Sequence, residues 1–397
     1  MTELTAITMS RYGMDFSLSE EQQMIQEAAK QFAKSELKPI AAELDRTGNR
    51  QLLLEKLKQL AELGFMGINV DPEYGGTGAG TIAFCLAITE LARGCASTAT
   101  TTSVTNMVAE VIQAVGNEAQ RQKYLPKLCS GKYPAGSFCL TEPGSGSDAA
   151  AMRTRAVKEG DEYVLNGSKL FISSAEFAGV FVVWAVTDPS AAKGKGISCF
   201  LVEAGTPGLI IGKAEEKMGQ KASVTNEVSF DHCRIPADNL LGEEHRGFRI
   251  AAGELAGGRI GIGALALGIG LEALDCARAY MHEREQFGRK LAQFQGLQWQ
   301  LADKYTELEG ARLLLLQAAW QKDAGMPFGP AASMGKLFAS EKANEACYLA
   351  LQIHGGVGYT REYPLERMSR DVRITTIYEG TSEIQRLIIA RHLLNVR

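Results

Sequence analysis

The apolar positions of the 397-residue chain follow three successive patterns. Residues 17–130 carry apolar side chains at helical intervals, behind Ser19 and Gln22 in capping-box spacing. From about residue 134 to residue 242, apolar side chains instead come in short β-branched or aromatic runs separated by turn residues. The helical interval returns at Gly247 and continues toward the C-terminal end. The pattern therefore predicts an all-β segment between two helical ones.

Turn and cap residues refine this prediction. Gly160-Asp161 and Asn166-Gly167 are turn signals inside the β segment, and the second is of a type that hairpins favour. Four long C-terminal helices are predicted, near residues 247–285, 294–323, 330–353 and 382–394. The last begins with Ser382 and Gln385 in capping-box spacing. We expect an α+β fold with an N-terminal helical domain, a middle β-barrel or β-sandwich domain and a C-terminal four-helix bundle, over residues 1–133, 134–245 and 246–397.

Composition excludes several classes of protein. With 45% hydrophobic residues, 22% charged residues and a net charge of −4, the chain is typical of globular proteins and lacks the basic surface that nucleic-acid binding needs. The longest apolar stretch, residues 260–274, is broken by Glu272 and falls short of the ~20 residues that span a bilayer. Residues 1–14 show no secretory signal and no transit peptide. The eight scattered cysteines have no metal-ligand spacing, so we expect reduced thiols, a cytoplasmic protein and no metal site.

The first motif that could carry chemistry is the run from Cys139 to Asp148. A predicted strand leads there into two glycines and several hydroxyls, which allows close backbone approach and offers donors to a ring edge or a phosphate. On its own, a surface turn explains the same residues better. Gly144, Gly146 and Ala149 also fit the dinucleotide pattern G-x-G-x-x-A, but strands rather than a crossover helix are expected to follow.

Two further motifs lie near the C-terminal end. The stretch 352–359 places three glycines after a helix, where they admit a ligand or simply end the helix. The stretch 377–382 places Glu379 just ahead of the last helix. Glu379 is then either a general base at a rigid corner, with Gly380 leaving room for a substrate, or a first-turn acid that stabilises the helix by roughly 0.3–1 kcal/mol. The chemistry alone leaves both interpretations open.

Together, these motifs resemble the acyl-CoA dehydrogenase family over residues 16–395. The family's two signature stretches are present as Cys139–Ala151 and Gln352–Asp371. The stretches Arg93–Thr98 and Gly258–Ile262 are most similar to the short-chain, butyryl-type branch. The resemblance implies an acyl-CoA dehydrogenase-like fold and FAD-dependent oxidation of an acyl-CoA to the trans-2-enoyl-CoA, as in fatty acid β-oxidation. It also implies a homotetramer and an electron-transfer flavoprotein as the acceptor.

The resemblance places FAD between the β domain and the C-terminal bundle, with its adenine end reaching a neighbouring subunit. The residues that match flavin and pyrophosphate contacts are Phe138, Leu140, Thr141, Gly146, Ser147, Phe171, Ile172 and Ser173. Further matching cofactor contacts, mostly to the partner subunit's FAD, are Arg284, Gln286, Phe287, Gln352, Gly356 and Thr381. Phe171 and Ser173 depart from the Trp and Thr that usually stand beside the flavin ring.

The resemblance also implies catalytic and substrate roles. Glu379 matches the base that removes the α-proton while the β-hydride passes to flavin N5. Some members carry the base on the first long helix of the bundle, where this chain has Gly258. The residues that match substrate contacts are Ser147, Gly253, Arg259, Tyr378 and Gly380. Because Gly253 replaces a bulky Gln of short-chain members, we expect a deeper or wider acyl pocket.

The stretch that would face the acyl end, residues 98–104, carries no charge, and Ala99 falls about where a dicarboxylate-binding arginine would be. A neutral short-to-medium acyl group, including branched or alicyclic ones, is therefore favoured. The alternatives are an acyl-CoA oxidase, a non-catalytic acyl-CoA-binding relative and a nicotinamide-dependent dehydrogenase. Oxidases are usually longer chains, an intact Glu379 argues against the second alternative, and only glycine patterns favour the third.

Overall fold

The computed structural model describes residues 17–396, and its N-terminal part is helical, as predicted. The helices are α1 (Glu20–Phe32), α2 (Ala41–Thr47), α3 (Arg50–Glu62), α4 (Gly80–Gly94), α5 (Ala96–Val115) and α6 (Glu118–Cys129), with a π-helical turn at Ala33–Leu37. At the start of α1, the Ser19 side chain accepts a hydrogen bond from the Gln22 backbone, and the Gln22 side chain accepts one from the Ser19 backbone. This capping box confirms the predicted helix start.

The middle part is a seven-stranded mixed sheet. Its strands are β1 (Ala135–Cys139), β2 (Arg155–Glu159), β3 (Glu162–Ser173), β4 (Ala178–Val186), β5 (Ile197–Glu203), β6 (Leu209–Ala214) and β7 (Thr225–Pro236). They are ordered β1-β4-β2-β3-β7-β6, and β5 pairs with β4. Strand β4 is buried on both faces, because Val182 and Trp184 pack into one apolar cluster and Phe181 and Val183 into another. This double burial explains its continuous apolar run.

One of the two predicted turns is wrong. Gly160-Asp161 connects β2 to β3, with Gly160 at φ +62°. Asn166-Gly167 lies inside β3, where the pairing with β7 shifts register between Leu165 and Gly167. A Cβ added at Gly167 would lie 2.6 Å from Thr154 Cα. The glycine therefore serves a bulge at which another backbone comes close, not a hairpin turn.

The C-terminal part is helical again. Its helices are α7 (Gly247–Glu283), α8 (Gln295–Asp323), α9 (Gly329–His354), α10 (Leu365–Arg373) and α11 (Ser382–Leu394). Helices α7, α8, α9 and α11 confirm the four predicted segments, and α10 is an additional short helix. The predicted Ser382–Gln385 cap is wrong by one residue, because the Thr381 side chain caps α11 by accepting from Ile384 N at 3.3 Å.

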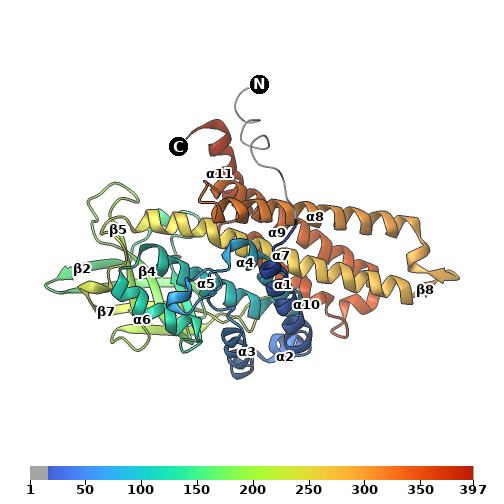
Figure 1. The fold of residues 1–397 in the computed structure, drawn as a ribbon, viewed down its shortest axis with the longest axis horizontal. Helices are drawn as coiled ribbons and strands as arrows, with labels where there is room; N and C mark the ends of the chain where they lie inside the picture. The colour runs from blue at the N-terminus through green and yellow to red at the C-terminus, as the bar shows by residue number, and fades with distance from the viewer. Residues whose placement is uncertain (1–16, 397) are drawn as a thin grey trace.

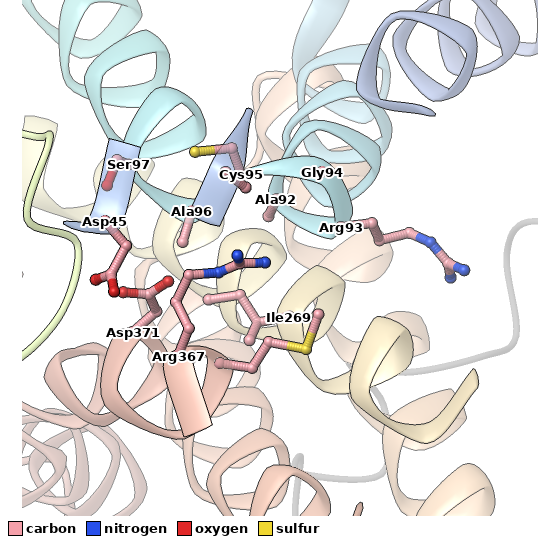
Figure 2. Close-up of a pocket in the computed structure, with 12 residues that line it drawn as sticks. Asp45, Ala92, Arg93, Gly94, Cys95, Ala96, Ser97, Ile269, Arg367 and Asp371 are labelled. Atoms are coloured by element: carbon pink, nitrogen blue, oxygen red, sulfur yellow. The ribbon is translucent and has the colours of Figure 1, made fainter. Parts of the chain in front are cut away.

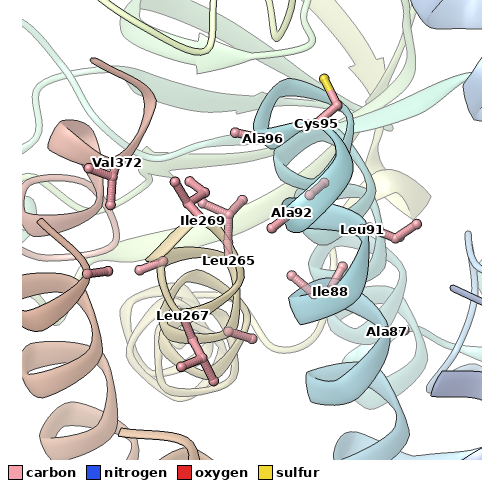
Figure 3. Packing of buried hydrophobic residues seen from close by; sticks show 14 of the residues in the cluster. Ala87, Ile88, Leu91, Ala92, Cys95, Ala96, Leu265, Leu267, Ile269 and Val372 are labelled. Atoms are coloured by element: carbon pink, nitrogen blue, oxygen red, sulfur yellow. The ribbon is translucent and has the colours of Figure 1, made fainter. Parts of the chain in front are cut away.

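Helix α7 is the central element of the molecule. Figure 1 shows the β domain at one end of α7 and the β8 (Glu285–Gln286) and β9 (Arg289–Lys290) hairpin at the other. In Figure 3, Ile88 and Leu91 of α4 lie beside Leu265 and Ile269 of α7, and all four are buried. The N-terminal and C-terminal helices thus share one apolar core, which fixes both around α7.

Helix α7 also bears on the prediction that the chain does not cross a bilayer. By length and composition it could cross a membrane, with a mean hydropathy of 1.7 over its most apolar window. However, 83% of that window is buried inside the protein, as in the core helix of a globular protein.

Candidate functional site

The glycine-rich loop after β1 is fixed to β3 by a buried ion pair. Lys169 is fully buried, and its Nζ donates to Glu142 Oε1 at 2.7 Å and to the Leu140 carbonyl at 3.3 Å. The Glu142 carboxylate also accepts from Arg153 N and Thr154 N, at 2.6 and 3.0 Å. Because every partner of this pair lies in or beside the loop, the loop is held in one position on the sheet.

The same contacts bring two predicted cofactor segments together. Leu170 N donates to the Thr141 carbonyl at 2.8 Å, and Ser137 Oγ donates to the Ser173 carbonyl at 2.7 Å. Phe171 therefore emerges beside the loop. Its side chain is 60% exposed and its backbone has φ +58°. A large aromatic residue held in this conformation is uncommon, and such strain concentrates at functional sites.

Other residues of the loop leave open space. A Cβ added at Gly144 or Gly146 would meet no atom within 4 Å, and Ser147 is exposed. Phe138 of β1 packs on Trp184 of β4, with 4.3 Å between ring centroids, and this contact fixes the strand that leads into the loop. Leu140 and Ile172 are buried and help to anchor the segment. The loop thus combines open backbone, a hydroxyl and an exposed ring.

Glu379 lies outside the last helix. Since Thr381 is the cap of α11, the first-turn acid is Glu383, and the interpretation of Glu379 as a first-turn acid is wrong. Glu379 has φ +54° and is followed by Gly380 at φ +89°. Its Oε2 is buried without a hydrogen-bond partner. A Cβ added at Gly258 would lie 3.0 Å from that oxygen, so the carboxyl packs on α7.

Burial raises the pKa of Glu379 to about 7, although Arg259 and Lys336 act to lower it. Arg259 is buried on α7, and its Nη1 donates to Ser333 Oγ at 3.5 Å. Lys336 of α9 is fully buried, and its Nζ donates to the Gly380 carbonyl at 2.8 Å. Burial lowers the pKa of Lys336 to about 8. The carboxyl can therefore change its charge near neutral pH within a site that holds two cations.

Tyr378 precedes the carboxyl and is held by a polar network. Gln220 Nε2 donates to the Tyr378 hydroxyl at 3.3 Å and to the Asp371 carbonyl at 3.0 Å. Thr100 Oγ1 of α5 donates to Gln220 Oε1 at 2.8 Å. Burial raises the pKa of the Tyr378 hydroxyl. The network connects α5, the β domain and the segment of Glu379.

A cavity of about 710 Å³ lies between the end of α5 and the start of α7. Gly253 and Glu254 line it, and Gly253 is exposed, with nothing within 4 Å of an added Cβ. Gly253 thus lies at an open rim, and its contact with an acyl group stays a prediction. Burial and the nearby Glu110 raise the pKa of Glu254 to about 8, and Lys322, which pairs with Glu110, opposes the rise.

A second cavity, of about 10 Å³, lies away from Glu379. Figure 2 shows Arg367 beside Asp45 and Asp371 at this place. Burial raises the pKa of Asp371 to about 6, against the effect of the Gln220 backbone N–H that it accepts. The cavity has no room for a substrate. Beside it, Arg370 of α10 pairs with Asp45 of α2 at 2.7 Å, and this ion pair connects the N-terminal and C-terminal helices.

Five predicted cofactor residues lie far from the loop. Arg284, Gln286 and Phe287 belong to the hairpin region at the opposite end of α7, seen in Figure 1. Gln352 and Gly356 lie at the end of α9. All five are exposed. Their contact with a neighbour's cofactor stays a prediction.

Models of three domains match most of the chain. The N-terminal, middle and C-terminal domain models of acyl-CoA dehydrogenases match residues 19–132, 137–233 and 245–394. The chain belongs to the acyl-CoA dehydrogenase family. This confirms the resemblance and the three-part fold that the sequence predicted.

Relatives agree with this assignment. The chain is 48% identical to an acryloyl-CoA reductase (NADH) of Anaerotignum propionicum, over 96% of each chain. It superposes on butyryl-CoA dehydrogenase from Megasphaera elsdenii with a TM-score of 0.92 and 42% identity, over 96% of this chain and 100% of that one. A chain from a study of the electron transferring flavoprotein of Acidaminococcus fermentans gives a TM-score of 0.93 and 46% identity, over 96% and 100%.

Acyl-CoA dehydrogenases are FAD flavoproteins, and FAD is the cofactor of this chain, as predicted. The loop fits this group, because open backbone at Gly144 and Gly146 and the hydroxyl of Ser147 suit a polar ring edge or a phosphate, and exposed Phe171 offers an apolar face. In residues 17–396, no group of three or more His, Cys, Asp or Glu side chains could hold a metal ion. All eight cysteines are free thiols.

The sequence missed several residues around Glu379. Lys336 and Gln220 carry no motif, and Gln385 was noted only as part of a predicted helix cap. Folding brings these three side chains from α9, the β domain and α11 to the segment 378–380, where they bind the Gly380 carbonyl, the Tyr378 hydroxyl and the Glu379 backbone carbonyl. The one signal in the sequence is Lys336 itself, a lysine among the small and apolar residues of α9. Lysines are rarely buried unless they have a partner, so its position indicates a specific contact.

Proposed function

We propose that this enzyme oxidises an acyl-CoA thioester to the trans-2-enoyl-CoA, with Glu379 as the base that removes the α-proton. The observation that carries the proposal is the half-buried Glu379 side chain, whose Oε2 is buried without a hydrogen-bond partner and whose pKa is raised by burial to about 7. A general base works best when its pKa lies near the operating pH. A carboxyl that served only to stabilise the fold would pair with a donor instead.

The surrounding residues support each part of this reaction. The Glu379 backbone N–H is proposed to donate to the developing enolate oxygen, which is the charge that such a site must stabilise. Arg259 and Lys336 favour the ionised carboxylate before proton transfer. Tyr378 and Gly380 are proposed to contact the substrate beside it. FAD, when bound, supplies the acceptor for the β-hydride.

The proposed FAD site has two parts. Phe138, Leu140, Thr141, Gly146, Ser147, Phe171, Ile172, Ser173 and Thr381 are proposed to bind the cofactor within the subunit. Arg284, Gln286, Phe287, Gln352 and Gly356 are proposed to bind the cofactor of a neighbour. The β8–β9 hairpin lies at the far end of α7 from the β domain, which supports an assembly in which a neighbour completes the FAD site; the proposed assembly is a homotetramer.

The substrate and the electron acceptor are also proposals. The buried residues 98–103 of α5 carry no charge, which supports a neutral short-to-medium acyl group, branched or alicyclic ones included. An electron-transfer flavoprotein is the proposed acceptor, in agreement with the study from which one similar chain comes. We infer a cytoplasmic location from the free cysteines and from the sequence.

A second candidate is reduction of an enoyl-CoA, because a relative at 48% identity is named acryloyl-CoA reductase (NADH). The same carboxyl would then deliver the α-proton. The two directions are separated by mixing the oxidised enzyme with acyl-CoA and the reduced enzyme with enoyl-CoA and comparing rates. Faster flavin reoxidation by the enoyl-CoA would favour the reductase.

Glu379→Gln tests the proposed base directly. The variant keeps the side-chain shape and the backbone amide, so FAD and acyl-CoA should still bind. Flavin reduction in an anaerobic single turnover should slow by at least ~10²–10⁴-fold, the contribution of a positioned acid–base group. Glu383→Gln, in the exposed first turn of α11, is the matched control and should leave the rate unchanged. A Glu379→Gln enzyme that reduces flavin at the parent rate would place the base elsewhere.

A further inference from the structure

The backbone at Glu379 is held in a conformation that it would not adopt alone. Non-glycine residues avoid the left-handed region, because their Cβ crowds the carbonyl oxygen there. Glu379 has φ +54°, and the next residue, Gly380, has φ +89°. Such strain persists only where the surrounding structure determines the backbone. The contacts of this turn should therefore show what holds it.

Two buried side chains hold the turn through one carbonyl. Lys336 Nζ and Gln385 Nε2 each donate to the Gly380 carbonyl at 2.8 Å. Gln385 Nε2 also donates to the Glu379 carbonyl at 3.1 Å. Both side chains are fully buried. Because Lys336 comes from α9 and Gln385 from α11, the turn is fixed from two directions.

The position of Lys336 is not explained by ion pairing. A buried ammonium group is costly and usually lies against a carboxylate. Lys336 donates to a backbone carbonyl, while burial lowers its pKa to about 8 and the charge of Glu379 acts to raise it. Burying this cation beside Glu379 destabilises the fold, but there the cation both fixes the turn and favours the ionised form of the Glu379 carboxyl.

We propose that Lys336 and Gln385 are positioning residues that clamp the Gly380 carbonyl and so direct the Glu379 carboxyl toward Gly258. Neither residue contacts the reacting atoms in this account. The inference rests on the proposed function, because it gives Glu379 a position to keep. Without the clamp the turn relaxes out of the left-handed region, and the carboxyl moves away from α7.

Three variants separate positioning from packing. Lys336→Met keeps the length of the side chain but removes the donor and the charge, whereas Gln385→Leu removes the second donor without changing charge. Lys342→Met is the control, because Lys342 lies on the same helix and pairs with Glu345 near the surface. FAD content and the dissociation constant for acyl-CoA are measured first, followed by the rate of flavin reduction in anaerobic single turnover.

Both clamp variants should reduce flavin roughly 10–100-fold more slowly, the effect of misplacing a catalytic group by about 1 Å, while acyl-CoA binding changes little. The pH midpoint of the reduction rate should move to higher pH in Lys336→Met only, because this variant removes a cation that lowers the pKa of Glu379. Lys336→Arg should restore part of the rate. Lys342→Met should behave as the parent.

The double variant and a structure complete the test. Because both side chains hold one carbonyl, the double variant should lose less than the product of the two single losses. Parent-like rates in both single variants would overturn the inference, and if Lys336→Met does not retain FAD, Gln385→Leu decides alone. A crystal structure of Gln385→Leu with Glu379 still at positive φ against Gly258 would also overturn it. If the parent itself does not reduce flavin, the proposed function fails, and that structure still decides the clamp.

Discussion

Replacing Glu379 by Gln should change stability as well as rate. Burial raises the pKa of this carboxyl from 4.5 to about 7. Burial in the folded protein favours the neutral carboxyl over the carboxylate. The contribution of this neutral carboxyl to the free energy of unfolding is therefore fully present below pH 4.5 and is lost as the pH rises through 7. At about 1.36 kcal/mol per pKa unit, the loss amounts to ~3 kcal/mol above pH 7. Gln cannot ionise and avoids this loss.

The assay compares thermal unfolding of parent and variant at about pH 5 and pH 8, both with saturating FAD. The free energy of unfolding of Glu379→Gln should exceed that of the parent, and the difference should grow by about 2 kcal/mol between the two pH values. Glu383→Gln is the control, and it should be slightly less stable than the parent at the higher pH because it removes a first-turn acid. A Glu379→Gln variant that is less stable at about pH 8, or whose difference does not depend on pH, would refute the reasoning.

Three further substitutions are informative. Gly380→Ala should slow flavin reduction and destabilise the fold by roughly 1–2 kcal/mol. The reason is that Gly380 has φ +89° and the new Cβ would lie 2.8 Å from Gln385 Nε2. An unchanged melting temperature would contradict this prediction. Glu379→Gly combined with Gly258→Glu should restore part of the single-turnover rate lost by Glu379→Gly alone, because the two positions face each other; no recovery would contradict it. Gly253→Gln should shift the preference toward butyryl-CoA by roughly 1–3 kcal/mol per methylene, and an unchanged chain-length profile would show that the cavity at Gly253 does not hold the acyl group.

The sequence predicted the fold well where the signal was a period. The helical intervals gave α7, α8, α9 and α11, and the short β-branched runs gave the strands, because these patterns record directly which face is buried. Single residues were less reliable. Asn166-Gly167 has turn chemistry, but the sheet uses Gly167 where Thr154 crosses closely. Ser382 has cap chemistry, but its neighbour Thr381 makes the bond.

In the functional site, too, the features that could be predicted lie in short stretches of sequence, and those that could not depend on the fold. Glu379 could be predicted because its motif lies in one short stretch, although two interpretations remained until its position relative to Thr381 was known. Lys336 and Gln385 could not be predicted, because their role depends on two helices meeting at one carbonyl. The charged group of Glu110, Glu254 and Lys322 was missed for the same reason, since no spacing in the sequence connects α5, α7 and α8.

The central claim is tested most directly by adding acyl-CoAs of increasing chain length to the purified protein without oxygen and following flavin absorbance. Bound FAD should be bleached by neutral short-to-medium acyl-CoAs, including branched or alicyclic ones, and not by glutaryl-CoA. A purified protein without flavin absorbance that gains none on addition of FAD would contradict the account. So would a flavin that no acyl-CoA bleaches.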